Sequence, residues 1–228
     1  MFIQPLAVLA AVRAEVSLLK FCLEHGAHFE KNSVWPLNVS VIDGPKSHEL
    51  LDLIYEYDFR HWRTKEIDCC LLEGCFDDPE TVKWMLDHGA RPYHRRMTVP
   101  PAATIRILLD RFGINWFHDS CALQFAARKG DLDVLTILLD AGADLEERPS
   151  SMFDVRDGGG PLTALIEAIA WKKFNAVRLL LSRGARVGDM ALELARSHQA
   201  DGHTDASAIL KFIEARHVEQ IVFGGSNL

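Results

Sequence analysis

The feature that most constrains the fold is a helix–turn–helix pattern in residues 121–144, CALQFAARKGDLDVLTILLDAGAD. A first helix carries the small residues Ala126 and Ala127, and a Gly-Asp turn follows at Gly130. The second helix is rich in leucine with a period near 3.6 residues, so one of its faces is apolar. It ends at Gly142, a residue suited to the left-handed conformation of a helix C-cap. Such a pair cannot bury its apolar face alone and needs neighbours of the same kind.

The same frame returns in other parts of the chain, which is the mark of a repeat architecture. Residues 5–28 and 163–186 reproduce both helices and the closing Gly-Ala pair. Residues 82–90 reproduce the second helix and its Gly-Ala, after a first helix predicted over 66–75. We therefore predict an all-α solenoid of stacked helix-turn-helix repeats. An unrelated helical bundle is the alternative, but a bundle has no reason to repeat Gly-Ala caps at this spacing.

Weaker copies complete the series. Residues 35–57 form a unit without a terminal Gly-Ala, and 104–114 form a second helix whose first helix is short or missing. Pro100 and Pro101 resist a helix interior, so an irregular turn is expected before that helix. The predicted organisation is a single solenoid of about six to seven units over 1–217, with a degenerate unit near 98–115, a C-terminal cap formed by the helix pair 189–216, and a tail over 218–228.

These units resemble ankyrin repeats, whose pattern runs Thr-Pro-Leu-His, Ala-Ala, a glycine turn, a leucine-rich helix and Gly-Ala. Residues 35–38, 121–124 and 163–166 occupy the Thr-Pro-Leu-His slot, although none matches it fully and no histidine stands there. The resemblance covers about residue 2 to about residue 216. It implies a hairpin-like finger loop after each Gly-Ala, and the expected fingers are 28–34, 59–64, 91–98, 115–120, 144–160 and 186–189.

Composition excludes several classes of protein. Hydrophobic residues make up 48% of the 228 positions and charged residues 25%, as in folded globular chains. The net charge of −7 is opposite in sign to that of a typical nucleic-acid or membrane-surface binder. No apolar run approaches the length of a membrane span. Residues 1–12 are apolar but lack the basic start of a signal peptide, so we interpret them as the first helix of the solenoid.

Cysteine usage points to the compartment. The chain has five cysteines, and this odd, scattered set does not indicate a disulfide framework. Free thiols favour a reducing environment, so we predict a cytoplasmic or otherwise intracellular protein. Cys69, Cys70, Cys75 and the nearby His61 lack the paired spacing of a zinc site. The three cysteines fall on a predicted inner helix, where cysteine acts as a compact apolar residue.

The sequence predicts no catalytic, cofactor or metal site. Catalysis requires a nucleophile beside a base, or acids that converge in a pocket, and neither pattern is present in the sequence. The run Gly158 to Gly160 is not followed by the Gly-Lys-Ser/Thr of a phosphate loop. An enzyme with an unrecognised site remains an alternative.

Partner-binding residues are expected on the fingers, where aromatic side chains cluster and can anchor an interface. Phe29 and Trp116 occupy a slot that ankyrin repeats fill with a buried residue, so we interpret them as structural. Basic residues in the fingers 59–64 and 91–98, and acidic residues in 144–160, suggest a bipolar surface, although ordinary solvated loops would look the same. The predicted partner-binding residues are Arg60, Trp62, Arg63, Tyr93, Arg95, Arg96, Phe117, His118 and Phe153.

The predicted function is that of a non-enzymatic protein-interaction module or adaptor. A protein partner would lie across the finger loops and the concave face of the inner helices, with no nucleic acid and no membrane insertion. A regulatory or targeting segment of a larger protein is a further alternative. Phe2, Ile3, Leu6 and Val8 make the N-terminal end unusually apolar. A solenoid end normally needs a polar outer face, so we expect this end either to continue a longer repeat array, or to meet a partner or a second copy of the chain by self-association.

Overall fold

The computed structural model describes residues 3–27, 47–58, 76–89, 99–150, 162–200 and 206–224. Within these ranges the secondary structure is helical throughout, with eleven α-helices, one 3-10 helix and no strand. The predicted all-α fold class is therefore confirmed. The chain divides into two compact units, Met1–Tyr93 and His94–Leu228, which are described separately.

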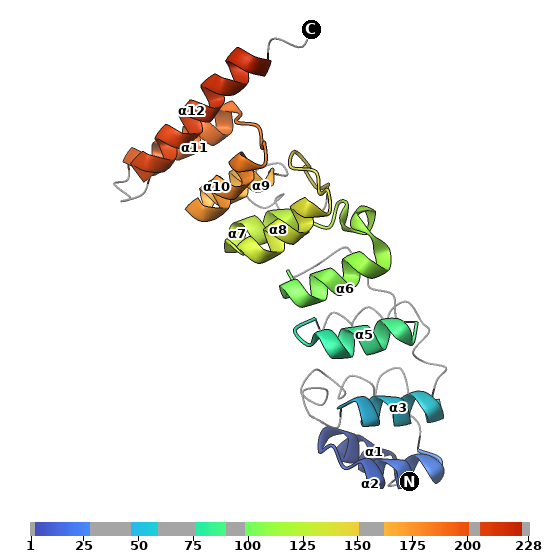
Figure 1. The fold of residues 1–228 in the computed structure, drawn as a ribbon. Helices are drawn as coiled ribbons and strands as arrows, with labels where there is room; N and C mark the ends of the chain where they lie inside the picture. Colours follow the sequence, from blue (N-terminus) through green and yellow to red (C-terminus); the bar gives the residue numbers. More distant parts are fainter. Residues whose placement is uncertain are drawn as a thin grey trace. The chain divides into compact units, whose positions relative to one another are not determined.

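The first unit holds four described helices, which are drawn in blue to green in Figure 1. Within it α1 packs on α2, α2 on α3, and α3 on α5. Leu19, Ile54 and Met85 are fully buried, because their positions face the neighbouring helix at each step. The helices are α1 (Ile3–Val12), α2 (Val16–Glu24), α3 (Ser47–Asp58) and α5 (Pro79–Asp87).

The second unit is built from two rows of helices (Figure 1). One row contains α7, α9 and α11, which contact one another in that order, and the other contains α6, α8, α10 and α12. The sequence interpretation of 104–114 as a second helix is thus consistent with α6, which packs on α8. The elements are α6 (Ala102–Phe112), η4 (Ile114–Phe117), α7 (Ala122–Lys129), α8 (Leu132–Asp140), α9 (Ala164–Ala170), α10 (Phe174–Ser182), α11 (Asp189–Ala200) and α12 (Ala206–Gly224).

Small side chains and capped ends explain the close stacking. Ala126 and Ala168 have no exposed surface, so the backbones of α7 and α9 approach closely. The Asp131 carboxylate caps α8 by accepting from the Val134 N–H at 3.0 Å. At the other end of that helix, Gly142 has a φ of 94°. The repeated Gly therefore supplies the left-handed residue that ends the helix, as predicted.

The C-terminal helix differs from the expectation. We predicted that the last helix ends near Arg216 and that a tail begins at 218, whereas α12 continues to Gly224. Its C-terminal half is hydrogen-bonded to the turn between α10 and α11. The Gln220 amide donates to the Ala185 carbonyl at 2.9 Å and accepts from the Val187 N–H at 3.0 Å, and the His217 ring lies 2.9 Å from the Val187 carbonyl oxygen. These side-chain contacts to backbone stabilise helical conformation beyond the predicted end.

Several predictions concern positions outside the described residues. These are the first helix over 66–75, the fingers 28–34, 59–64 and 91–98, and the part of the 144–160 finger after Ser150. The 115–120 finger, which the structure describes in full, begins inside the 3-10 helix η4 rather than in a hairpin strand.

Candidate partner-binding site

Two loops of the second unit hold each other in place. The Asp119 N–H donates to the Glu147 carboxylate at 2.7 Å, and the Asp119 carboxylate accepts from the Ser150 N–H and, at 2.8 Å, from its hydroxyl. Gln124, at the start of α7, donates its amide N–H to the Glu147 carbonyl at 3.0 Å. Asp119 has a φ of 62°, a left-handed conformation that aspartate tolerates better than most residues. The loops 115–120 and 144–150 are therefore cross-linked by hydrogen bonds, with donors and acceptors on both loops.

Glu146, beside Glu147, forms a hydrogen bond with the next loop along the stack rather than with the previous one. The Glu146 carboxylate accepts from the Arg186 backbone N–H at 2.7 Å, and the Glu146 N–H donates to the Asp144 carboxylate at 2.9 Å. Adjacent glutamates in one loop thus bind the loop before it and the loop after it. A row of loops that is ordered in this way loses less conformational entropy when a partner binds.

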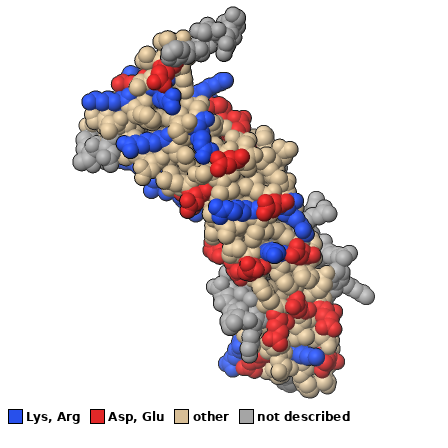
Figure 2. Space-filling view, in the orientation of Figure 1, with Lys and Arg blue, Asp and Glu red and all other residues tan. Residues whose placement is uncertain are grey.

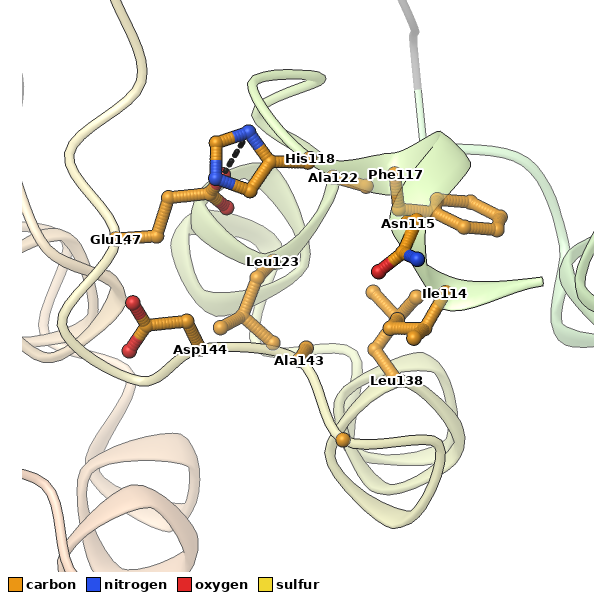
Figure 3. A pocket seen from close by; sticks show the side chains of 11 residues that line it. Ile114, Asn115, Phe117, His118, Ala122, Leu123, Leu138, Ala143, Asp144 and Glu147 are labelled. Atoms are coloured by element: carbon orange, nitrogen blue, oxygen red, sulfur yellow. Dashed lines mark ion pairs between the residues drawn. The ribbon is translucent and has the colours of Figure 1, made fainter.

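A pocket of about 220 Å³ opens between the two cross-linked loops (Figure 3). Its floor is apolar and comes from Leu123 of α7 and Leu138 of α8, both nearly inaccessible to solvent. Figure 3 shows the His118 ring beside the Glu147 carboxylate on one side, with the Nδ1–Oε1 distance at 3.6 Å. Asn115 lies on the other side. The pocket thus combines an apolar floor with polar groups at its edge, the arrangement that is usual in recognition sites.

The structure describes two of the nine predicted partner-binding residues. His118 lines the pocket and its side chain is 77% exposed, so it is accessible to a partner. Phe117 is only 5% exposed, and this corrects its assignment as a surface anchor. The turn of η4 directs Phe117 inward, while the neighbouring Trp116 stacks on Phe112 with ring centroids 5.5 Å apart. The other seven predicted residues (Arg60, Trp62, Arg63, Tyr93, Arg95, Arg96 and Phe153) lie outside the described residues.

A second feature, which joins the C-terminal end of α7 to the middle of α9, was not predicted. The Arg128 guanidinium donates to both oxygens of the Glu167 carboxylate, at 2.9 and 3.3 Å, and Glu167 is 4% exposed. The same guanidinium lies 5.0 Å from the ring centroid of Trp171, a residue that is 53% exposed. The sequence signal for this ion pair was a glutamate on the apolar face of an inner helix. A buried carboxylate needs a cationic partner, so one could have been expected nearby.

The charge of the surface can be followed in Figure 2. Both signs are interspersed over the described residues of the face that it displays. The acidic part of the predicted bipolar surface is represented by Asp144, Glu146 and Glu147, whereas its basic part lies outside the described residues. In the described ranges, no group of three or more His, Cys, Asp or Glu side chains is placed to hold a metal ion. None of the described helices is both long enough and apolar enough to span a bilayer.

Comparison with known proteins identifies the repeat. A family model of ankyrin repeats, in three copies, matches residues 75–191, which is about half of the chain and runs from just before α5 into α11. A search of the curated proteins finds no match to this sequence.

Proposed function

Because the chain belongs to the ankyrin-repeat family, we propose that it is a protein-binding module or adaptor without enzymatic activity. Ankyrin repeats generally act as protein–protein interaction modules and are typically non-enzymatic. The proposed surface comprises the finger loops and the adjoining ends of the inner helices. A protein partner would lie across this surface. The protein itself would be located inside the cell.

The observation that carries the proposal is the cross-linked pair of loops 115–120 and 144–150. Loops are usually the most mobile part of a fold, yet here Asp119 forms hydrogen bonds with Glu147, 28 positions away, and with Ser150, 31 positions away. The side chain of His118 remains exposed beside them. A rigid loop row with accessible polar groups is the kind of surface that supports specific recognition, because little ordering is left for the binding step.

Site-specific photocrosslinking tests the proposal. A benzophenone amino acid replaces His118, on the proposed surface, and in a matched protein it replaces the exposed Arg178 on the outer helix α10. Each protein is incubated with cell lysate and irradiated, and the adducts are identified by mass spectrometry. We expect a defined protein adduct from position 118 that is absent from position 178. Equal adducts at both positions, or none at 118, would overturn this placement of the surface.

The bipolar surface is part of the proposal. Acidic residues of the 144–150 loop would meet a basic region of the partner, and the basic fingers would meet an acidic one, which orients the complex. Replacing Arg95 and Arg96 by glutamate should weaken binding of the partner obtained by crosslinking. The affinities of the native protein and of the variant are compared at low salt, where surface charges act most strongly. Equal affinities would show that Arg95 and Arg96 are not part of the binding surface.

Self-association through the N-terminal end is a second proposed interaction. Leu6, Leu9 and Val12 recur every three residues on α1 and are all exposed. A helix that is apolar on all sides normally packs on all sides. Sedimentation velocity of the protein and of a Leu6→Gln, Leu9→Gln variant provides the test. A concentration-dependent dimer that the variant loses supports the idea, and a monomer at every concentration rejects it.

A further inference from the structure

We propose that the pocket between the loops 115–120 and 144–150 binds a long basic side chain, arginine or lysine, of the protein partner. The Glu147 and Asp144 carboxylates would accept its hydrogen bonds and the apolar floor would hold its aliphatic stem. This inference rests on the proposed function and assigns the chemistry by which a partner is recognised at one place.

The size of the pocket favours a single side chain. Its volume of about 220 Å³ is below the roughly 300–1,000 Å³ of pockets that enclose drug-sized ligands. Ile114, Leu123 and Leu138 line its inner part. The methylene groups of lysine and arginine pack well on such a surface, while the charged end stays at the rim. The dimensions and the floor therefore suit a side chain with an apolar stem and a polar end.

The charge of the rim selects the polar end. Glu147 is 12% exposed, and its Oε1 is oriented by the Asp119 N–H at 2.7 Å. Asp144 lies at the mouth and is exposed. Among the described lining residues there are two carboxylates and neither lysine nor arginine. A carboxylate that is fixed and partly withdrawn from water makes stronger charge-assisted hydrogen bonds than a mobile one in bulk solvent.

Other occupants fit the same pocket less well. A phosphate or carboxylate ligand would be repelled by Glu147 and Asp144 at close range. An apolar side chain would remove water from the Glu147 carboxylate without replacing its hydrogen bonds, which is costly. The exposed His118 ring flanks Glu147 at 3.6 Å, a distance longer than a good hydrogen bond. A guanidinium or ammonium group at Glu147 would therefore replace a weak neighbour with a strong one.

Methyl NMR tests the pocket without knowledge of the partner. The full chain carries ¹³C-labelled isoleucine and leucine methyl groups and is titrated with N-acetyl-arginine methylamide. N-acetyl-citrulline methylamide, which has the same shape without the charge, is the control probe. The methyl groups of Ile114, Leu123 and Leu138 report on the pocket, and those of the buried Leu180 in α10 report on distant change. We expect the arginine probe, but not citrulline, to shift the pocket signals.

Two variants separate recognition from folding. Asp144→Asn and Glu147→Gln keep the side-chain shape and the oxygen that accepts from the loop backbone, and together they should weaken the arginine probe about tenfold or more. Glu193→Gln, an exposed acid on α11, is the matched control and should leave the affinity unchanged. If the double variant alters the Leu180 signals, Asp144→Asn alone replaces it, and a threefold or greater loss is then required.

The results distinguish this inference from the proposed function. Charge-selective shifts that the carboxylate variants abolish support the pocket. Equal response to arginine and citrulline, or no response at the pocket methyl groups, overturns it, and a specific crosslink at position 118 would then leave the adaptor role standing. Failure of both the probe and the crosslink overturns both.

Discussion

The Asp119 N–H donates to Glu147 Oε1 at 2.7 Å, and the Asp119 carboxylate accepts in turn from Ser150. Each loop thus supplies both a donor and an acceptor to the other, so neither can move without breaking bonds in both directions. Because His118 directly precedes Asp119, its position over the pocket depends on this exchange. The geometry of the proposed binding site is therefore set by contacts within the chain itself, before a partner binds.

Removing the Glu147 carboxylate should loosen both loops. We expect Glu147→Ala to lower the free energy of unfolding by about 1–2 kcal/mol, since a partly buried N–H loses its charged acceptor. Glu147→Gln should cost less than half as much, because the amide oxygen still accepts. Urea denaturation measures the difference, and hydrogen exchange at the Asp119 amide should accelerate in the alanine variant. The exposed Glu193→Ala is the control and should change stability by no more than about 0.5 kcal/mol. An Asp119 amide that exchanges equally fast in Glu147→Ala and in the native protein would contradict the prediction.

The regular part of the fold could be predicted because its determinants are local. The leucine period, the Gly-Asp turn and the closing Gly-Ala all lie within one pair of helices, and α7 and α8 follow them closely. Asp131 caps α8 through a residue three positions away. Such signals act within a turn or two of helix, so a sequence contains them in full.

The site was less predictable, because its contacts join positions far apart in the chain. Glu147 meets Asp119 across 28 positions and Arg128 meets Glu167 across 39, and the stacking register decides both pairings. Phe117 and Trp116 show that even the environments of neighbouring side chains can be hard to predict from sequence. A 3-10 helix turns each residue by about 120°, so adjacent aromatics take different environments, and composition does not tell which is buried. Membership of a finger is therefore a weaker guide to exposure than the local helix geometry.

Breaking the Arg128–Glu167 pair should destabilise the stack of α7 and α9. Arg128→Met leaves a buried carboxylate without its cation, and we expect a loss of about 2 kcal/mol, below the 3–5 typical of fully buried pairs because the arginine is partly exposed. Glu167→Gln should cost about 1 kcal/mol. The double variant should cost less than the two losses added together, and a double-mutant cycle by urea denaturation gives the coupling. Additive losses would mean that the two side chains act independently.

The turn between α1 and α2 has a non-glycine residue in a strained conformation. Ala14 has a φ of 53°, where the corresponding turn before α8 has Gly130 at 76°. We expect Ala14→Gly to raise the free energy of unfolding by about 0.5 kcal/mol, because relief of the left-handed strain exceeds the added flexibility of the unfolded chain. Gly130→Ala should lower it by about 1–2 kcal/mol, since its Cβ would also lie 3.1 Å from the Lys173 side chain. Thermal unfolding of both variants provides the measurement. A destabilised Ala14→Gly protein would contradict the claim that the conformation of Ala14 is strained.

Cys22 should make the stability of the first unit depend on pH. Its side chain has no exposed surface, and this burial raises the pKa of the thiol above its ordinary value. Unfolding exposes a thiol that ionises at about pH 8.5. The unfolded state therefore releases its proton at a lower pH than the folded state. The stabilisation that Cys22 contributes is complete below the unfolded-state pKa and declines as the pH rises towards the folded-state pKa.

The variant Cys22→Ala provides the test. It removes this pH dependence and adds only a small cavity, whose cost in stability does not vary with pH. The difference in unfolding free energy between the native protein and Cys22→Ala should thus shrink between pH 7 and pH 9.5. The other cysteines are present in both proteins, so their ionisation cancels from the difference. A constant difference across this range would show that the thiol ionises as readily in the folded state as in the unfolded one, and that its burial is not maintained in solution.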